Sequence, residues 1–414
     1  MLKDWYKMKK PQKLFPHAVA NPSNSTTPIT KKYDAIVVGA GPAGATAAYF
    51  MAKEGLDVLL LDRAPYPGAK NCGGAALIAE HIHKLFPNFW EECPCERIVT
   101  DQSYWFMTED SLLAAKFSSL KLAAAPYNRL TVKRINLYKW LTEKAVATGA
   151  TLLLGHQVSE VIFDEQQAKG VRVGPPHNID FSADIIILAD GVNSLLAEKA
   201  DIAPRICPQN TSLYVKETIE LSSAVIEERF NLLPGCGSII SLIGYPTAGF
   251  NGTGSIHTFK DCINLNVGMS VADFAQSGLP PSDLLERIKK HPLIQPLLDG
   301  GVTREYGASL IPEGGYYAIP ELVHDRLLIV GDAGLLVNGT HGINLAMWSG
   351  FFAAKTAFAA KISRNFSRGK LFLYRTLLNE SFVMQDMKAN AGAAKLQRDI
   401  PYMFDLYTRI ANEA

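Results

Sequence analysis

Three glycines and one aspartate near the N-terminus carry the clearest chemical signal in the sequence. Gly39, Gly41 and Gly44 stand in "IVVGAGPAGATAAYF", and Asp62 follows 18 residues after the last of them. Glycines at this spacing allow a tight turn, a close approach of the backbone to a pyrophosphate, and close packing of a helix on a strand. An aspartate at this distance can accept hydrogen bonds from a ribose diol. The pattern predicts a dinucleotide site, and at this point both NAD and FAD remain open.

A strand, a helix and a second strand must position these residues. Residues 35–38 are apolar and largely β-branched, which suits a buried strand. The segment after Gly41 has a helical pattern and would direct its free N–H groups and the positive end of its dipole at phosphates. A second apolar run, "DVLLLD", ends at Asp62. This context favours dinucleotide binding over a purely structural turn, and it adds two neighbouring residues to the predicted contacts, Ala43 and Arg63.

Two later motifs favour one of the two nucleotides. The stretches "FSADIIILADGVNS" and "DRLLIVGDAG" are apolar strands that end near Asp190 and Asp332, and a long helical pattern follows the second. We expect Asp332 to bind the hydroxyls of a ribityl chain. Backbone N–H groups at the start of the long helix would face the O2 edge of a flavin and stabilise the negative charge of its reduced form. NAD has no ribityl chain, so these motifs favour FAD, with the helix start at Gly342, Ile343 and Asn344.

The three motifs, in this order, resemble a flavoprotein superfamily that includes aromatic hydroxylases, geranylgeranyl reductases and electron-transfer-flavoprotein:quinone oxidoreductases. Within it, the sequence is similar to the FixC-like branch, the bacterial relatives of electron-transfer-flavoprotein:quinone oxidoreductase. The similarity runs from about Tyr33 to Gly350. It lies in the segments "YPGAKNCGGAAL", "KKHPLIQPLLDGG", "EYGASLIPEGGYYAIPEL" and "GINLAMWSG".

The resemblance implies further contacts with FAD. Cys72 and Gly73 occupy the place where the family passes its chain near the isoalloxazine ring, and Arg134 matches the family's cofactor-binding arginine. Val158 falls where a backbone amide meets the adenine. Tyr138 departs from the pattern, because an aspartate is expected at its position.

The expected fold is α/β, with an FAD-binding Rossmann-like domain of the GR2 type, an inserted antiparallel-sheet substrate domain and a helical C-terminus. The resemblance and the strand pattern make the FAD-binding domain discontinuous, with the segments 33–104, 130–206 and 318–356. Residues 105–129 and 207–317 would form the substrate or partner domain, and residues 357–414 a helical C-terminal region.

Composition limits the remaining possibilities. The chain of 414 residues is 48% hydrophobic and 20% charged with a net charge of +1, a balance that gives no support for nucleic-acid binding. Residues 1–32 hold seven Lys and one Asp and are expected to be a basic, disordered leader; the alternative is docking to anionic lipid. No stretch approaches the roughly 18 uncharged apolar residues of a spanning helix. We expect a cytoplasmic protein, at most peripheral at the inner face of the membrane.

The six cysteines, at positions 72, 93, 95, 207, 236 and 262, are scattered along the chain. Their spacing matches neither a zinc ribbon nor an iron–sulfur motif, so no metal site is predicted. Thiols without a secretory signal are typical of a reducing compartment. The cysteine ligands of full-length quinone oxidoreductases are missing here, as they are in FixC-like proteins.

Three functions remain open. The leading hypothesis is an FAD-dependent oxidoreductase whose electron donor, by resemblance, is an electron transfer flavoprotein and whose acceptor is a small ferredoxin-like protein or a quinone. The second is reduction of a prenyl double bond, or hydroxylation of an aromatic substrate, within the same superfamily. The third is a flavin-binding maturation partner with little turnover. Electron transfer requires no acid–base side chain, so we assign no catalytic residue.

Overall fold

The structure is a computed structural model that describes residues 31–414, except 339–340, 393–395, 397–398, 401 and 414. The predicted leader therefore lies outside the described residues, apart from its last two residues. None of the described helices is long and apolar enough to cross a bilayer.

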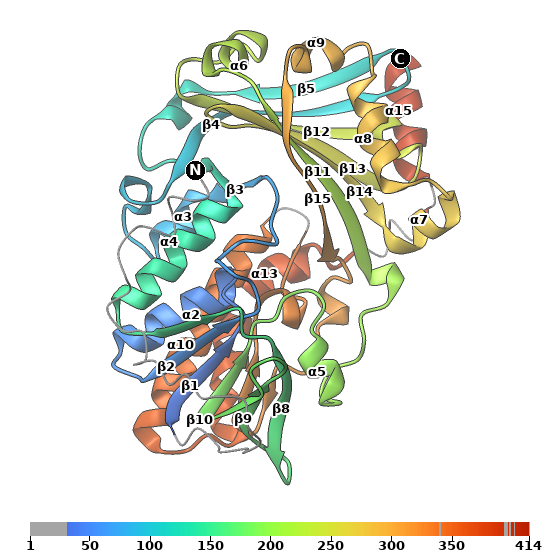
Figure 1. The fold of residues 1–414 in the computed structure, drawn as a ribbon. Helices are drawn as coiled ribbons and strands as arrows, with labels where there is room; N and C mark the ends of the chain where they lie inside the picture. The colour runs from blue at the N-terminus through green and yellow to red at the C-terminus, as the bar shows by residue number, and fades with distance from the viewer. Residues whose placement is uncertain (1–30, 339–340, 393–395, 397–398, 401, 414) are drawn as a thin grey trace.

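The described residues form two β-sheets, one above the other in Figure 1. The lower sheet has eight strands, and its central part, in the order β17-β10-β1-β2-β7, is parallel. The strands are β1 (Lys32–Val38), β2 (Val58–Asp62), β7 (Thr151–Leu154), β8 (Val158–Asp164), β9 (Gln167–Val173), β10 (Ile179–Leu188), β16 (Val323–His324) and β17 (Leu327–Ile329).

The upper sheet has nine strands among the described residues and is antiparallel except for the pairing of β12 with β4. The strands are β3 (Gly74–Ile78), β4 (Cys95–Met107), β5 (Leu112–Ser118), β6 (Arg129–Lys133), β11 (Thr211–Glu220), β12 (Cys236–Gly244), β13 (Gly252–Thr258), β14 (Cys262–Ser270) and β15 (Val302–Pro312).

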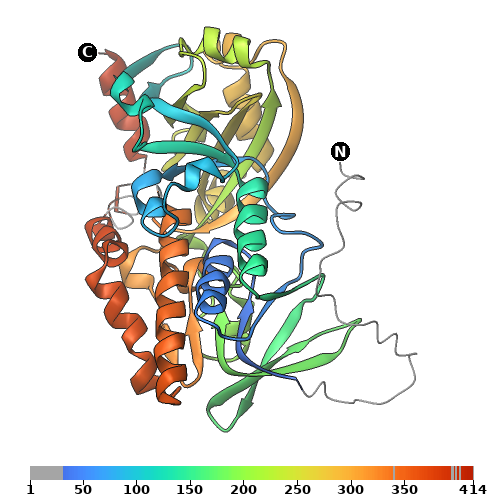
Figure 2. The same ribbon diagram turned by 90° about the vertical axis from the view of Figure 1, so that its left-hand side faces the viewer.

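Helices cover both sheets and fill the C-terminal part of the chain, as Figure 2 shows from the side. The α-helices are α2 (Pro42–Lys53), α3 (Ala79–His83), α4 (Arg134–Ala147), α5 (Leu195–Lys199), α6 (Ser223–Arg229), α7 (Val271–Ser277), α8 (Pro281–Lys289), α9 (Gln295–Leu298), α10 (Gly342–Ser363), α11 (Arg368–Leu371), α12 (Leu373–Glu380), α13 (Phe382–Ala389) and α15 (Met403–Glu413). The 3-10 helices are η1 (Phe89–Glu91), η2 (Leu120–Ala123), η3 (Pro208–Asn210), η4 (Tyr245–Thr247), η5 (Tyr316–Ala318) and η6 (Gly331–Gly334).

This architecture confirms the predicted fold class: a mainly parallel sheet with helices, an antiparallel second sheet and a helical C-terminus. The sequence patterns explain the local structure. Strands β1 and β10 are buried on both faces, as apolar, β-branched runs require. Strand β13 alternates buried and half-buried residues, which is typical of a sheet with one wetter face.

The sheets divide the chain differently from the predicted segments. Strands β3 and β6 and the first part of β4 belong to the upper sheet, although residues 33–104 and 130–206 were assigned to the cofactor domain. Helix α10 extends across the predicted boundary at residue 356, and α15 returns to pack on β4 and β12. These arrangements depend on pairing and packing between segments far apart in the sequence, which no local pattern reveals.

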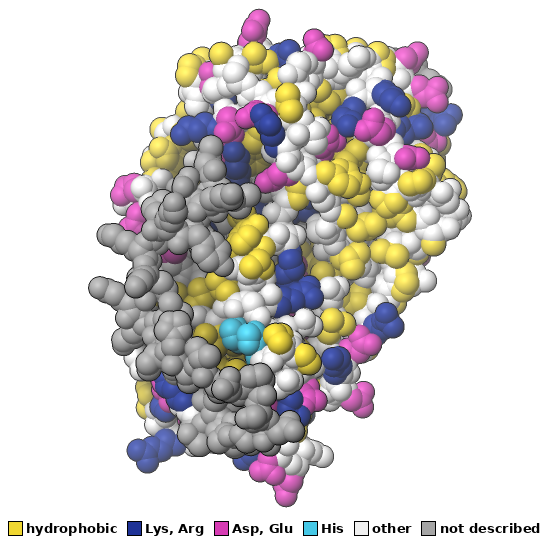
Figure 3. All heavy atoms as spheres, in the orientation of Figure 1, with side chains coloured by type: hydrophobic (Ala, Val, Ile, Leu, Met, Phe, Trp, Pro, Cys, Tyr) yellow, Lys and Arg dark blue, Asp and Glu magenta, His cyan; other side chains and the backbone are white. Residues whose placement is uncertain are grey.

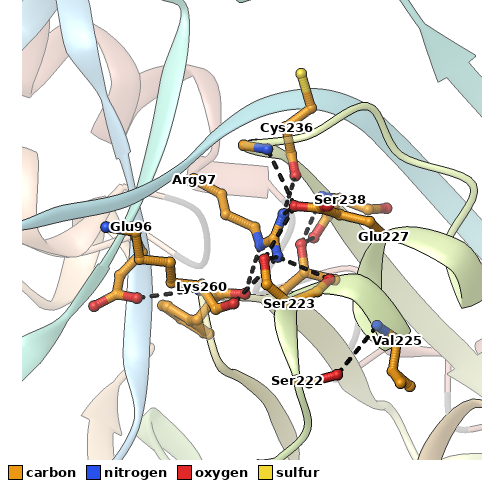
Figure 4. A network of polar contacts seen from close by, with 12 residues as sticks. Glu96, Arg97, Ser222, Ser223, Val225, Glu227, Cys236, Ser238 and Lys260 are labelled. Carbon is orange, nitrogen blue, oxygen red and sulfur yellow. Dashed lines mark hydrogen bonds and ion pairs between the residues drawn. The ribbon is translucent and has the colours of Figure 1, made fainter.

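A buried arginine connects several elements of the upper sheet (Figure 4). The side chain of Arg97, on β4, is 1% exposed and pairs with Glu227 of α6 at 2.7 Å. Its Nη1 also donates to the carbonyl of Cys236 at 2.9 Å, and its Nη2 donates to Ser223 Oγ at 2.7 Å. Its Nε donates to the carbonyl of Phe259. Four segments of the upper sheet therefore depend on one guanidinium group.

Replacing Arg97 by alanine should lower the free energy of unfolding by about 3–5 kcal/mol, because it leaves buried acceptors without a donor. The matched control is Arg172→Ala, which removes an arginine that is 48% exposed and also ion-paired, and should cost about 1 kcal/mol or less. Urea denaturation followed by circular dichroism measures both. Equal losses would contradict a structural role for the Arg97 network.

Candidate functional site

Four parallel strands of the lower sheet end side by side. The register pairs Val38 of β1 with Leu61 of β2 and with Leu188 of β10, and Leu188 with Ile329 of β17. Each strand is followed by a glycine or an acidic residue at the same edge, namely Gly39, Asp62, Asp190 and Asp332. Ligands of open α/β sheets bind outside the carboxyl ends of the strands, so this edge is the expected site.

A cavity of about 950 Å³ opens at this edge and extends to the upper sheet. Its volume lies near the upper end of the range of about 300–1,000 Å³ that is usual for small-molecule and cofactor sites. Basic residues Arg63, Lys70 and Lys199 are among those that line it. Figure 3 shows basic side chains near the centre of this face of the molecule, between hydrophobic areas above and below.

The glycine-rich turn is held by close contacts within the protein. At Gly39, where φ is +107°, an added Cβ would lie 2.2 Å from the carbonyl oxygen of Ala189. At Gly44, a Cβ would lie 1.9 Å from the carbonyl oxygen of Gly39. Neither position can hold a side chain unless the backbone moves.

Gly41 is different, because an added Cβ there meets no atom within 4 Å. Gly41 is also the N-cap of α2, and its φ of −72° is open to any residue. No side chain caps α2, so its first N–H groups face the cavity without a side-chain partner. The fold does not require glycine at this position, whereas a close approach of a phosphate would.

Asp62 connects the end of β2 to the glycine-rich turn. Its Oδ2 accepts a hydrogen bond from Ala40 N at 2.8 Å, and its Oδ1 accepts one from Ala64 N at 2.7 Å. Each carboxylate oxygen retains a further lone pair that can accept a hydrogen bond from a ligand. The neighbouring Asp190 has a buried Oδ1 with no hydrogen-bond partner among the described residues. Burial raises the pKa of Asp190, although a bond from Leu196 N opposes that rise.

Two charged residues face each other deeper in the cavity. Burial raises the pKa of Asp332 to about 6, against the opposing effects of Arg134 and Lys216. Arg134 is the first residue of α4, and Tyr138 lies one turn further along the helix and also lines the cavity. Burial raises the pKa of Tyr138, and the charge of Arg134 acts against this. Tyr138, at the position where an aspartate was expected, therefore adds a neutral hydroxyl to the wall.

Most of the predicted contact residues come together around this cavity. Those that line it are Gly39, Gly41, Ala43, Asp62, Arg63, Arg134, Val158, Asp332, Gly342 and Ile343.

The other four predicted residues, Gly44, Asn344, Cys72 and Gly73, are not among the cavity-lining residues. Gly44 packs α2 on the turn, as the close contact above requires. Asn344 is buried, and its side-chain amide pairs with both backbone groups of Ile78 on β3. Gly73 N donates to Glu305, and Cys72 packs against Gly307 of β15. The main role of these four residues in the structure is to join segments of the fold.

Sequence analysis missed several residues of the upper sheet that face the same cavity. Lys216 and Tyr214 on β11, His257 on β13 and Ser309 on β15 all line it. The signal was present in "TSLYVKETIE", where alternation places Ser212, Tyr214, Lys216 and Thr218 on one face of a strand. The alternation does not indicate which face meets the cavity, because both faces of β11 are largely buried.

The donor set fits FAD. The uncapped N-terminus of α2 and the open position at Gly41 suit a pyrophosphate, and the unpaired oxygen of Asp190 is available to a hydroxyl donor. Helix α10, 22 residues long, begins at Gly342 without a side-chain cap and presents its N-terminus to the cavity wall. A dinucleotide with a polyhydroxyl chain and an anionic reduced ring matches these features.

Comparison with known proteins agrees with this chemistry. The family model of FAD dependent oxidoreductases matches residues 34–214. The chain is 42% identical over 366 residues to the protein FixC of Azorhizobium caulinodans, which covers 87% of this chain and 83% of that protein. It is 37% identical over 383 residues to a probable electron transfer flavoprotein-quinone oxidoreductase, YdiS, of Escherichia coli, with coverage of 92% and 88%.

Solved structures share the fold at lower identity. A geranylgeranyl bacteriochlorophyll reductase-like protein from Thermoplasma acidophilum superposes with a TM-score of 0.74 at 20% identity, over 93% of this chain and 92% of that one. The halogenase PltM in complex with FAD gives a TM-score of 0.66 at 17% identity, over 89% and 77%. The chain therefore belongs to the FixC family and is an FAD-dependent oxidoreductase of electron transfer.

Proposed function

We propose that this enzyme takes electrons from an electron transfer flavoprotein and passes them through FAD to a small ferredoxin-like protein or a quinone. The observation that carries the proposal is the 37% identity, over 92% of this chain, to a protein named as a probable electron transfer flavoprotein-quinone oxidoreductase. The FixC proteins, at up to 42% identity in the comparisons above, support the same assignment.

The cysteines favour a separate partner for any iron–sulfur chemistry. In sequence, Cys93 and Cys95 are the one close pair among the six. Within the described part of the chain, no group of three or more His, Cys, Asp or Glu side chains is arranged to hold a metal ion. An iron–sulfur cluster on the route to quinone would then belong to the ferredoxin-like partner.

We assign the two ends of FAD from the strand order. The N–H groups at the start of α2, next to Gly41, would hold the pyrophosphate, and Asp62 would accept from the adenosine ribose. The backbone of Val158 would meet the adenine. FAD, when bound, supplies a ring that accepts and returns one or two electrons. The remaining lower-sheet residues near the adenosine half are Gly39, Ala43 and Arg63.

The redox half of FAD would lie between Asp332, Arg134 and the start of α10. Asp332 would accept hydrogen bonds from the ribityl hydroxyls. The N-terminus of α10, with Gly342 and Ile343 at the cavity wall, carries a partial positive charge of about half a unit. This charge and that of Arg134 would stabilise negative charge in that part of the cavity. Cys72, Gly73 and Asn344 would contribute from behind the wall, through the segments that they fix.

The wall contributed by the upper sheet includes apolar side chains. Ile239, Ile243, Leu310 and Ile311 line this part of the cavity, together with Tyr214. Such a surface suits an apolar acceptor such as a quinone, or a lipid substrate. The alternative function, reduction of a prenyl double bond, would use the same wall.

Asp332 should make FAD binding depend on pH. Its pKa is about 6 in the protein without FAD, and the ionised carboxylate is the better acceptor for ribityl hydroxyls. Affinity should therefore be full at pH 7.5 and fall as the pH drops through 6, by roughly tenfold at pH 5. Asp332→Asn should bind FAD more weakly at pH 7.5 and lose most of this pH dependence. Fluorescence titration of the apo-proteins measures both, and an unchanged pH dependence in the variant would refute the placement of Asp332.

Electron flow can be followed by stopped-flow absorbance of the flavin under anaerobic conditions. Reduced electron transfer flavoprotein should bleach the flavin of the oxidised enzyme, whereas NADPH should not. The reduced enzyme should pass electrons slowly to a short-chain quinone, and at least about tenfold faster when the cognate ferredoxin is added, because a partner then supplies the missing relay.

Other outcomes reassign the partners. Rapid reoxidation by quinone without ferredoxin would make quinone the direct acceptor. Failure of electron transfer flavoprotein to reduce the enzyme, together with rapid oxidation of NADPH in the presence of a prenyl lipid, would contradict the proposal and favour the reductase.

A further inference from the structure

A lysine is buried in the cavity wall of the upper sheet. Lys216 lies near the middle of β11, which is paired with β14 on one side and β15 on the other. The residue is 4% exposed, and its Nζ donates to Ser309 Oγ at 2.7 Å. Within the described part of the chain, Lys216 forms no ion pair. An ammonium group has three protons to donate, so a charged Lys216 would be poorly satisfied here.

The groups around Lys216 come from several elements. Asn266 of β14 and Ser309 of β15 are its uncharged neighbours. The titratable and charged groups are Arg134 of α4, Asp332 of η6, His257 of β13 and Cys72 of the loop before β3.

The electrostatics disfavour a second positive charge in this wall. Burial lowers the pKa of Lys216 well below its usual value, and Arg134 adds to that effect, whereas Cys72 and Asp332 oppose it. Burial, assisted by Arg134 and Lys216, lowers the pKa of His257 to about 4. Asp332 supplies a single negative charge, which Arg134 already balances. New negative charge in the cavity would remove the obstacle to protonation of Lys216.

We propose that Lys216 balances the charge of the reduced cofactor: its Nζ is a neutral amine while FAD is oxidised and holds a proton while FAD is reduced. This inference rests on the proposed function, because it requires the redox half of FAD to lie beside Asp332 and Arg134. When the donor gives up two electrons, these electrons and one proton enter the cofactor, and a second proton moves from water to Lys216 Nζ. Reoxidation by the acceptor returns both protons.

The neighbouring groups cannot take this role between pH 7 and 9. Arg134 remains protonated throughout this range. Asp332 is already ionised, and His257 is already neutral. The Cys72 thiol keeps its proton, because burial and then Glu305 raise its pKa. Lys216 is therefore a charge-compensating residue.

The test is the two-electron reduction potential of the bound flavin, measured by anaerobic dye-coupled titration between pH 7 and 9. Uptake of one proton per two electrons changes the potential by about 30 mV per pH unit, and uptake of two protons by about 60 mV. The wild-type enzyme should show the steeper slope. Lys216→Met should show the shallower slope, with its potential furthest below the wild type at pH 7.

Lys216→Arg separates charge from structure. Its guanidinium group is charged in both redox states, so the slope should also be about 30 mV per pH unit, but the potential should lie above that of Lys216→Met at every pH. The matched control is Lys289→Met, since Lys289 is already paired with Glu217 and Glu286 on the other side of β11. It should keep the wild-type slope.

Parallel slopes for the wild type and Lys216→Met would overturn the inference, as would a wild-type slope of about 30 mV per pH unit. If Lys216→Met does not retain FAD, the slope of Lys216→Arg decides in its place. The titration uses no physiological donor or acceptor. A failure of the assigned partners therefore leaves this result unaffected, and a negative result here leaves those partners unaffected.

Discussion

The structure depends on the very close approach of helix α2 to its neighbours. A Cβ at Gly44 would lie 1.9 Å from the carbonyl oxygen of Gly39, and a Cβ at Gly350 of α10 would lie 2.1 Å from the carbonyl oxygen of Ala43. Glycine at these positions lets α2 lie directly on the turn after β1 and lets α10 lie directly on α2. The N-termini of both helices therefore face one cavity, at the edge where four parallel strands end. Two positive helix ends and an acidic residue after three of the strands produce the electrostatic character of the site.

The parts of this arrangement that local sequence determines could be predicted. The glycine spacing, the apolar strand before it and Asp62 after the next strand are features within 28 consecutive residues, and the structure places β1, α2 and β2 there. The start of α10 at Gly342 was also predictable from the helical pattern. The parts that depend on distant pairing could not be predicted. Neither the position of β3 and β6 in the upper sheet nor the return of α15 to β4 has a local signal.

The same distinction applies to the site. Lys216 and Ser309 meet because β11 and β15 pair in a particular register across an interval of about ninety residues. Asn344 was expected at the flavin, but its side chain instead anchors Ile78, a contact that depends on the packing of α10 against β3. The lower sheet thus supplies a predictable nucleotide-binding half. The upper sheet supplies side chains that can set the redox properties and admit an acceptor.

The central claim is that the cavity at the strand ends holds FAD with its pyrophosphate at the start of α2. Gly41→Ala tests it most directly, because an added Cβ meets no protein atom and the backbone conformation suits alanine. The account predicts an unchanged urea midpoint for the apo-protein and FAD binding weakened by at least about tenfold, equivalent to roughly 1.4 kcal/mol. A variant that binds FAD as tightly as the wild type would contradict this placement of the cofactor.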